Sequence, residues 1–178
     1  AFSDNEKKIS AYYVQSRAAS EMGWTEKAKD YLDELLTLDP NNTSGLLYRG
    51  EIALRLGENE IALHDLNKGI TQAEGKIKPN DLASSLSKRG LAHLALNQIN
   101  EAEADARKAL ELSKNLPEVY DLWSRVYEEK REIKKALAAC EQAHQLSIEK
   151  NKLSFMTPER QKLSERLVDL RVKALRME

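Results

Sequence analysis

Apolar residues recur every three or four positions through most of the chain, with lysine, glutamate and arginine between them. This spacing places the apolar side chains on one face of an α-helix. No stretch of the sequence alternates apolar and polar residues as a half-buried strand does. The pattern therefore predicts an all-α protein, with helix pairs near residues 9–37, 43–74, 81–113 and 117–149 and a final helix from about residue 158.

The four prolines punctuate this helical pattern at intervals of about forty residues, at Pro40, Pro79, Pro117 and Pro158. Proline breaks the interior of a helix but is tolerated in its first turn or between helices. Each proline therefore marks a joint, and evenly spaced joints in a helical chain indicate a repeated unit.

Small residues recur in the same frame in four successive repeats, where a serine or glycine precedes an alanine by twelve positions. The pairs are Ser16–Ala28, Gly50–Ala62, Gly90–Ala102 and Ser124–Ala136. Two helices can cross closely only where the side chains between them are small, so we expect each pair to mark a crossing. Larger side chains are expected to fill the core around the crossings: Leu32, Leu35, Leu46, Leu66, Leu86, Leu110, Leu112, Tyr120, Tyr127 and Leu137.

The turn inside each repeat also has a signature. Gly23 and Gly57 follow the first helices of the first two repeats, where a left-handed residue suits glycine. Asn97 takes the same place in the third repeat. Arg131 stands there in the fourth and does not match.

These features resemble the tetratricopeptide repeat (TPR), a helix–turn–helix unit of about 34 residues with two small residues and a proline near its end. The segment Leu38–Asn42 is typical of the junction between such repeats. The resemblance implies a TPR-type α-solenoid, with four repeats at about 9–42, 43–82, 83–116 and 117–150 and a C-terminal capping helix within 151–178. About six extra residues around 73–80 lengthen the second repeat.

The tail has the features of a separate helix. Thr157, Pro158 and Glu159 form a typical helix start, with a capping hydroxyl, a proline and an acid. One helical face then carries apolar residues that we expect to cover the fourth repeat, because the last repeat of a solenoid has no neighbour. These residues are Leu163, Leu167, Leu170, Ala174 and Met177.

A second apolar line on the tail consists of Val168, Val172 and Leu175. At 100° per residue it lies well away from the first face. We expect it to stay partly exposed and to support a weak homodimer, helix against helix.

Composition excludes several classes of function. The formal net charge is -1, which argues against nucleic acid or an anionic membrane as the partner. No apolar run reaches the roughly twenty residues of a membrane span, and no signal-peptide pattern is found. The single cysteine, Cys140, cannot form an internal disulfide, so we expect a reducing compartment such as the cytoplasm.

The sequence also contains no catalytic motif. His64, His93 and His144 fall in different repeats, and we expect His93 to be packed or hydrogen-bonded. Cys140 falls at an inward position of the fourth repeat and is expected to be a core residue. With no metal-ligand spacing and no phosphate-binding loop, we expect neither an enzyme nor a cofactor nor a metal site.

The resemblance implies that the first helix of each repeat lines a concave groove for a partner protein. The expected lining residues are Tyr13, Arg17, Leu47, Tyr48, Glu51, Arg55, Ser87, Lys88, Leu91, Asp121, Arg125 and Glu128, with Ser84 beside them. Leu47 and Leu91 should point outward, whereas Leu54 and Leu94 are either groove residues or half-buried between repeats. Because Glu118, Asp121, Glu128 and Glu129 surround the fourth repeat, the partner segment is expected to be apolar or amphipathic with a basic end.

Some TPR co-chaperones grip the C-terminal carboxylate of heat-shock proteins with lysine, arginine and asparagine side chains. The corresponding positions here hold Tyr13, Arg17, Tyr48, Ser84 and Lys88. The asparagines are missing, so we do not expect carboxylate capture of this type.

Two classes of function stay open. The chain is an interaction scaffold or adaptor that binds a peptide or helix, or it is a regulatory or targeting domain of a larger enzyme or co-chaperone, such as a prolyl isomerase. A longer chain around these residues would indicate the second.

Overall fold

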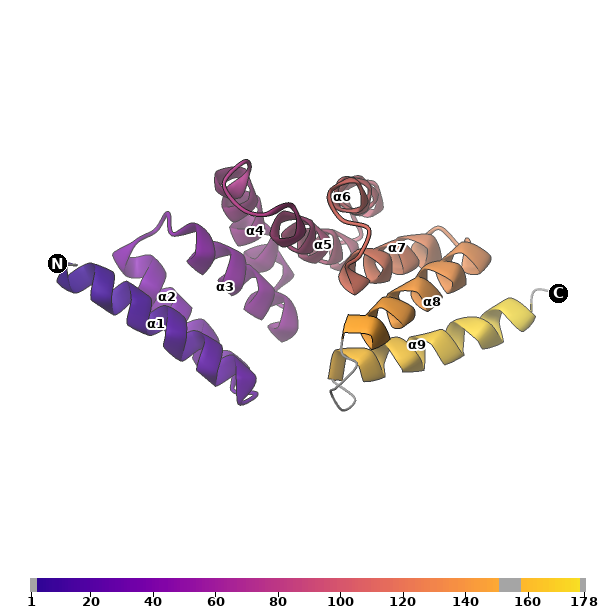
Figure 1. Cartoon of the computed structure of the whole chain (residues 1–178), viewed down its shortest axis with the longest axis horizontal. Coiled ribbons are helices and arrows are strands. Elements are labelled where there is room, and N and C mark those ends of the chain that lie inside the picture. Colours follow the sequence, from indigo (N-terminus) through magenta and orange to yellow (C-terminus); the bar gives the residue numbers. More distant parts are fainter. Residues whose placement is uncertain (1–2, 151–157, 177–178) are drawn as a thin grey trace. The chain divides into compact units, whose positions relative to one another are not determined.

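The computed structural model describes residues 3–150 and 158–176, and the regular elements in these ranges are all α-helices (Figure 1). They are α1 (Asp4–Glu21), α2 (Thr25–Leu38), α3 (Thr43–Leu56), α4 (Asn59–Ala73), α5 (Pro79–Ala95), α6 (Ile99–Leu112), α7 (Pro117–Glu129), α8 (Ile133–Lys150) and α9 (Pro158–Leu175). The chain divides into two compact parts, the N-terminal half (Ala1–Ile77) and the C-terminal half (Lys78–Glu178). The predicted helix pairs and final helix are confirmed.

The first helix begins earlier than the sequence pattern predicts, at Asp4 rather than near Ile9. Its start is a capping box: the Ser3 hydroxyl accepts from the Glu6 amide at 3.2 Å, and the Glu6 carboxylate accepts from the Ser3 amide at 2.6 Å. Two backbone donors of the first turn are thereby satisfied, which stabilises a turn that carries little apolar surface.

The small residues lie where the helices of each pair cross. Ser16, Gly50, Gly90 and Ser124 are all buried, and the four alanines have no exposed surface. A Cβ on Gly50 would lie 2.7 Å from Leu66 Cγ and 3.3 Å from the Ala62 carbonyl oxygen. In the fourth repeat the Ser124 hydroxyl donates to the Ala136 carbonyl at 2.9 Å. The predicted small residues are thus all buried, and the contacts of Gly50 and Ser124 place two of the crossings where they were expected.

The turns inside the repeats share one left-handed conformation. Gly23, Gly57 and Asn97 have φ of 79°, 77° and 58°, as expected. Arg131 adopts it too, with φ of 60°, although its side chain does not match the pattern. Two backbone hydrogen bonds hold it there, from the Arg131 amide to Glu128 and from the Glu132 amide to Tyr127. The backbone hydrogen bonds at the end of the helix therefore set the left-handed conformation, and this turn accepts an arginine in place of glycine.

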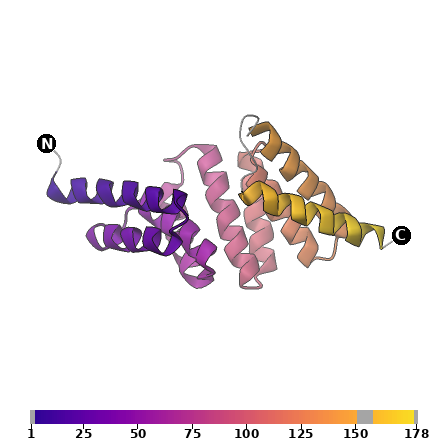
Figure 2. The same cartoon turned by 90° about the horizontal axis from the view of Figure 1, so that it is seen from below.

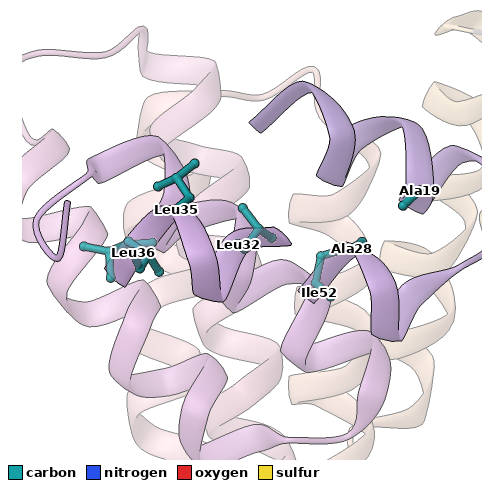
Figure 3. Close-up of a cluster of buried hydrophobic side chains, with 7 residues drawn as sticks. Ala19, Ala28, Leu32, Leu35, Leu36 and Ile52 are labelled. Carbon is teal, nitrogen blue, oxygen red and sulfur yellow. The ribbon is translucent and has the colours of Figure 1, made fainter. Parts of the chain in front are cut away.

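In the N-terminal half, α2 packs against both α1 and α3 and supplies most residues of the core cluster that these three helices share. Leu32, Leu35 and Leu36 of α2 pack against Ala19 of α1 and Ile52 of α3, all of them buried (Figure 3). Burial of each leucine contributes about 1.5–3 kcal/mol relative to an exposed one.

Two ion pairs inside the repeats were not predicted. Arg49 of α3 forms two hydrogen bonds with Asp65 of α4, at 2.6 and 2.9 Å, and Asp65 has no exposed surface. Arg89 of α5 binds Asp105 of α6 in the same way, forty residues later. A guanidinium that binds a carboxylate through two hydrogen bonds fixes the rotation of one helix relative to the other. It also explains why acids stand on the buried sides of α4 and α6.

The last helix covers α8, as expected (Figures 1 and 2). Leu163 and Leu167 are 8% exposed and Leu170 is fully buried. The second line stays exposed, with Val168 at 62%, Val172 at 42% and Leu175 at 70%. The predicted cap of Thr157 and the contribution of Met177 lie outside the described residues.

We predict that Ala102→Leu lowers the free energy of unfolding by about 1–3 kcal/mol, because Ala102 is fully buried at the α5–α6 crossing. Thermal unfolding followed by circular dichroism measures the effect. Ala104→Leu is the matched control, because Ala104 lies on the exposed side of the same helix. An Ala102→Leu midpoint at or above that of the original chain would show that the crossing is misplaced.

Candidate functional site

The N-terminal half brings two predicted groove residues together as an aromatic pair. Tyr13 of α1 and Tyr48 of α3 have ring centroids 5.9 Å apart, with their planes tilted by 58°. Both side chains are half-buried, so each packs against the core and presents an edge to solvent. First helices of neighbouring repeats thus share one surface.

Charged side chains from the predicted set lie on the same two helices. Arg17 is 60% exposed and lies 3.9 Å from Glu21. On α3, Arg55 lies 3.3 Å from Glu51, and it also donates to the Ser20 hydroxyl of α1 at 2.8 Å. We call the surface formed by Tyr13, Arg17, Tyr48, Glu51 and Arg55 the α1–α3 face.

The members of the α1–α3 face affect one another electrostatically. Burial raises the pKa of Tyr13, Arg17 lowers it, and Tyr48 and Glu51 raise it further. The net result is an upward pKa shift, so the Tyr13 hydroxyl stays protonated at neutral pH. It can donate a hydrogen bond to a carbonyl or carboxylate oxygen of a ligand.

The predicted apolar residues of the groove are less exposed than expected. Leu47 is half-buried and packs against Gly69 of α4. A Cβ added to that glycine would lie only 2.7 Å from Leu47 Cδ2. Leu91 is also half-buried and packs with Leu94 on the core cluster of the third and fourth repeats. The expectation that Leu47 and Leu91 point outward is therefore wrong. Leu54 and Leu94 take the half-buried alternative.

Ser87 was predicted to line the groove and does not. Its side chain has no exposed surface, and its hydroxyl donates to the Ala83 carbonyl at 2.9 Å. A serine in a helix can satisfy its hydroxyl with the carbonyl four residues earlier, which allows it to be buried like an alanine. Lys88 and Ser84, on the same helix, are half-buried.

The predicted residues of the fourth repeat are joined by the last helix. Arg125 donates to Asp121 at 3.0 Å. Arg166 of α9 donates to Asp121, to the Ser124 hydroxyl at 3.1 Å and to Glu128 at 2.5 Å. Lys173, also on α9, lies 3.2 Å from Glu128. Two of the four acids that suggested a partner with a basic end, Asp121 and Glu128, are thus paired within the chain, which removes much of the basis of that expectation.

Arg166 was not predicted as a binding residue, because only the apolar face of the last helix was expected to contact the fourth repeat. A signal existed: the residue directly before Leu167 is an arginine, on the flank of the capping face and only 19% exposed in the structure. Burial alone would raise the pKa of Glu128, but the hydrogen bonds and charges of Arg166 and Lys173 hold it below its ordinary value.

The other candidate groups are structural. Cys140 is fully buried, its Sγ lies 3.8 Å from the Leu163 carbonyl oxygen, and burial raises its pKa. Its expected place in the core is confirmed. His93 Nδ1 lies 2.6 Å from Gln98, which confirms a hydrogen-bonded histidine. His144 contacts the Ser164 hydroxyl of α9 at 3.0 Å, and His64 is exposed.

Two general findings concern the described residues only. No three histidine, cysteine, aspartate or glutamate side chains among them are grouped to hold a metal ion. None of the helices they form combines the length and the apolar character that crossing a membrane requires.

Known proteins with this architecture are helical-repeat proteins. The tetratricopeptide repeat family model matches residues 9–42 and 83–116. MamA 41-end from Desulfovibrio magneticus RS-1 is 20% identical with a TM-score of 0.66, over 98% of this chain and 88% of that one. Cut9 in the APC/C hetero-tetramer Cut9–Hcn1 is 17% identical with a TM-score of 0.71, over 88% of this chain and 29% of that one.

A further similar structure is the first TPR of Spaghetti (RPAP3) bound to the HSP90 peptide SRMEEVD. It is 25% identical with a TM-score of 0.57, over 74% of this chain and 94% of that one. Comparison with curated proteins gives no match. The described residues form an α-solenoid with an additional C-terminal helix, and two segments of the chain match the tetratricopeptide repeat model.

We predict that Arg166→Met lowers the free energy of unfolding by about 1–3 kcal/mol at pH 7, because Asp121 and Glu128 lose their shared cation in a partly buried site. The pKa of Glu128 is lowered by folding, so the pairing contributes stability above pH ~4.3, the ordinary value in an unfolded chain. The contribution is lost as the pH falls through the lower pKa of the folded protein.

Urea titrations at pH 7 and pH 3.5 of the original chain and Arg166→Met measure this difference. It should shrink at the lower pH. Arg171→Met is the control, because Arg171 is 58% exposed and pairs only across the surface with Glu141. A loss of stability that is equal at both pH values would show that the ion pairs are not its source.

Proposed function

We propose that the chain is an interaction scaffold or adaptor that binds a peptide or helical segment of another protein and carries out no catalysis. The observation that supports this is the α1–α3 face, where an aromatic pair lies beside Arg17, which is 60% exposed, and Arg55, which is 43% exposed. Tyrosine and arginine are the residue types most enriched where binding energy is concentrated in protein interfaces.

The chemistry of the α1–α3 face favours a particular kind of ligand. Two tyrosine rings offer apolar area with little loss of side-chain freedom, and their hydroxyls can bind backbone groups. Arg17 and Arg55 each have a glutamate neighbour, so the face has no strong net charge. The proposed ligand is an amphipathic segment whose apolar side chains pack on the tyrosines and whose carbonyl or carboxylate oxygens meet the arginines.

In the C-terminal half, fewer of the predicted groove residues are available to a ligand. Ser87 is buried, Leu91 is half-buried against the core, Asp121 binds Arg166, and Glu128 binds Arg166 and Lys173. We therefore place the main binding surface on the N-terminal half, with a partner in the cytoplasm, where the single thiol stays reduced.

Carboxylate capture of the heat-shock-protein type is not part of the proposal. The RPAP3 domain was solved with an HSP90 peptide. At the positions corresponding to the clamp this chain has Tyr13, Arg17, Tyr48, Ser84 and Lys88, and no asparagine. The amide groups that would orient a terminal carboxylate are missing from the set.

We predict that Arg17→Glu weakens ligand binding about tenfold or more, because it reverses a charge at the exposed edge of the α1–α3 face. Ligands would be selected from a displayed peptide library, and their dissociation constants measured by calorimetry.

Arg107→Glu is the matched control for this experiment. Arg107 is also exposed, at 67%, and also pairs with a glutamate one turn away, but it lies on the second helix α6. Equal affinities for both variants, or a library that yields no ligand, would contradict the proposed surface.

A further inference from the structure

The exposed large apolar side chains gather on the first and last helices. Of the seven in the described part of the chain, Val14, Met22 and Trp24 are in or next to α1, at 55–65% exposure. Val168, Val172 and Leu175 are on α9, and the seventh is Ile61. We call Ala11, Val14 and Ala18 of α1, together with Met22 directly after it, the head face; all four are exposed. Val168, Val172 and Leu175 form the tail face.

The residues of α7 that correspond in repeat position to the head face are buried. Ser16 and Ser124 hold the same place in their repeats, so Ala11, Val14 and Ala18 correspond to residues 108 positions later in α7. These are Val119, Leu122 and Val126, which have no exposed surface. Leu122 and Val126 pack against Ala102 and Ala106 of α6, the second helix of the preceding repeat. By this equivalence the head face is shaped to receive a helix.

Trp24 adds an independent sign of a contact surface. It directly precedes α2 and is 55% exposed, with Lys27 Nζ 5.4 Å from the ring centroid. The other three repeats have Glu58, Gln98 and Glu132 at this position. An exposed tryptophan where the other repeats carry a polar residue is characteristic of an interface anchor.

We propose that the head face of one copy of this chain binds the tail face of another. The two faces match in shape. Ala11 and Ala18 are seven residues apart, as are Val168 and Leu175, so the two apolar rows have the same length. Small residues on one helix accept branched residues from the other, as Gly45 of α3 accepts Leu35 and Leu36 of α2.

Charged residues of both signs flank the two faces. On α1, Lys7 and Lys8 precede the head face and Glu21 follows it. On α9, Glu165 and Asp169 lie toward the start of the tail face and Arg176 lies at its end. A parallel alignment of the two helices pairs Lys8 with Glu165 and brings Glu21 toward Arg176. An antiparallel alignment pairs Arg17 with Asp169 but brings Glu21 toward Glu165. Complementary charges therefore support the contact in either direction.

Such a contact joins two different surfaces and is not closed by a two-fold axis. Each copy added leaves one head face and one tail face free, so association continues with concentration. The homodimer expected from the sequence, tail face against tail face, would stop at two copies and would place branched side chains against branched side chains. The proposal uses none of the residues of the α1–α3 face that bind the ligand in the proposed function, so each can fail alone.

Two blocking variants test the contact. Val14→Glu removes the head face and Val172→Glu the tail face. We expect the weight-average mass of the original chain to rise beyond that of a dimer in sedimentation experiments up to about 1 mM. Each variant alone should stay monomeric, because it has only one kind of free face. A 1:1 mixture of the two should form a dimer and nothing larger, because each supplies the face that the other lacks.

The alternatives give different results. Self-association of Val14→Glu alone would indicate a contact between tail faces, and self-association of Val172→Glu alone a contact between head faces. Either result overturns the proposal, as does an original chain that is monomeric throughout. Ile61→Glu is the control, since Ile61 is an exposed apolar residue on α4, outside both faces, and should leave association unchanged. Circular dichroism verifies that each variant is folded.

Discussion

Everything in this protein depends on how closely the two helices of each repeat can cross. At the crossings a serine or glycine stands opposite an alanine, and a Cβ on Gly50 would meet Leu66 at 2.7 Å and the Ala62 carbonyl oxygen at 3.3 Å. The close approach buries the leucines on either side of the crossing. It also brings Arg49 within reach of Asp65 and Arg89 within reach of Asp105. A larger residue at a crossing would push the two helices apart and so weaken both the apolar contacts and these ion pairs.

The consequence for function is a division of surfaces. Second helices such as α2 bury one side in the core, as Leu32, Leu35 and Leu36 show. First helices pack one side against the core and expose the other to solvent. Tyr13 and Tyr48 do both, because each side chain is partly buried against the core and partly exposed. A rigid pair of first helices can present a fixed arrangement of aromatic and charged groups without ordering a loop.

The last helix shows how a repeat array can end. Its leucines cover α8, while Arg166 and Lys173 neutralise acids of α7 that would otherwise be available to a partner. Solenoids need a polar outer surface at their ends to prevent unlimited stacking. Here the outer sides of α1 and α9 retain apolar rows, and this motivates the proposed contact between copies.

The sequence by itself determined the class of fold, the positions of the helices and the crossings. These features depend on local chemistry: the period of apolar residues, the prolines at the joints and the small residues twelve positions apart. It also predicted the two faces of α9, because the angle between positions on one helix follows from its geometry. Even so, the first helix began earlier than predicted, since its start depends on the capping box and not on apolar periodicity.

Tertiary structure alone decided which residues of the first helices are available to a ligand. Leu47 is half-buried against Gly69 of α4, and Ser87 is buried because a backbone carbonyl satisfies its hydroxyl. Asp121 and Glu128 were taken by Arg166, more than thirty-five residues away in the sequence. Periodicity assigns a residue to a side of its own helix, but its exposure depends on the volume and charge of neighbours that the local pattern does not contain.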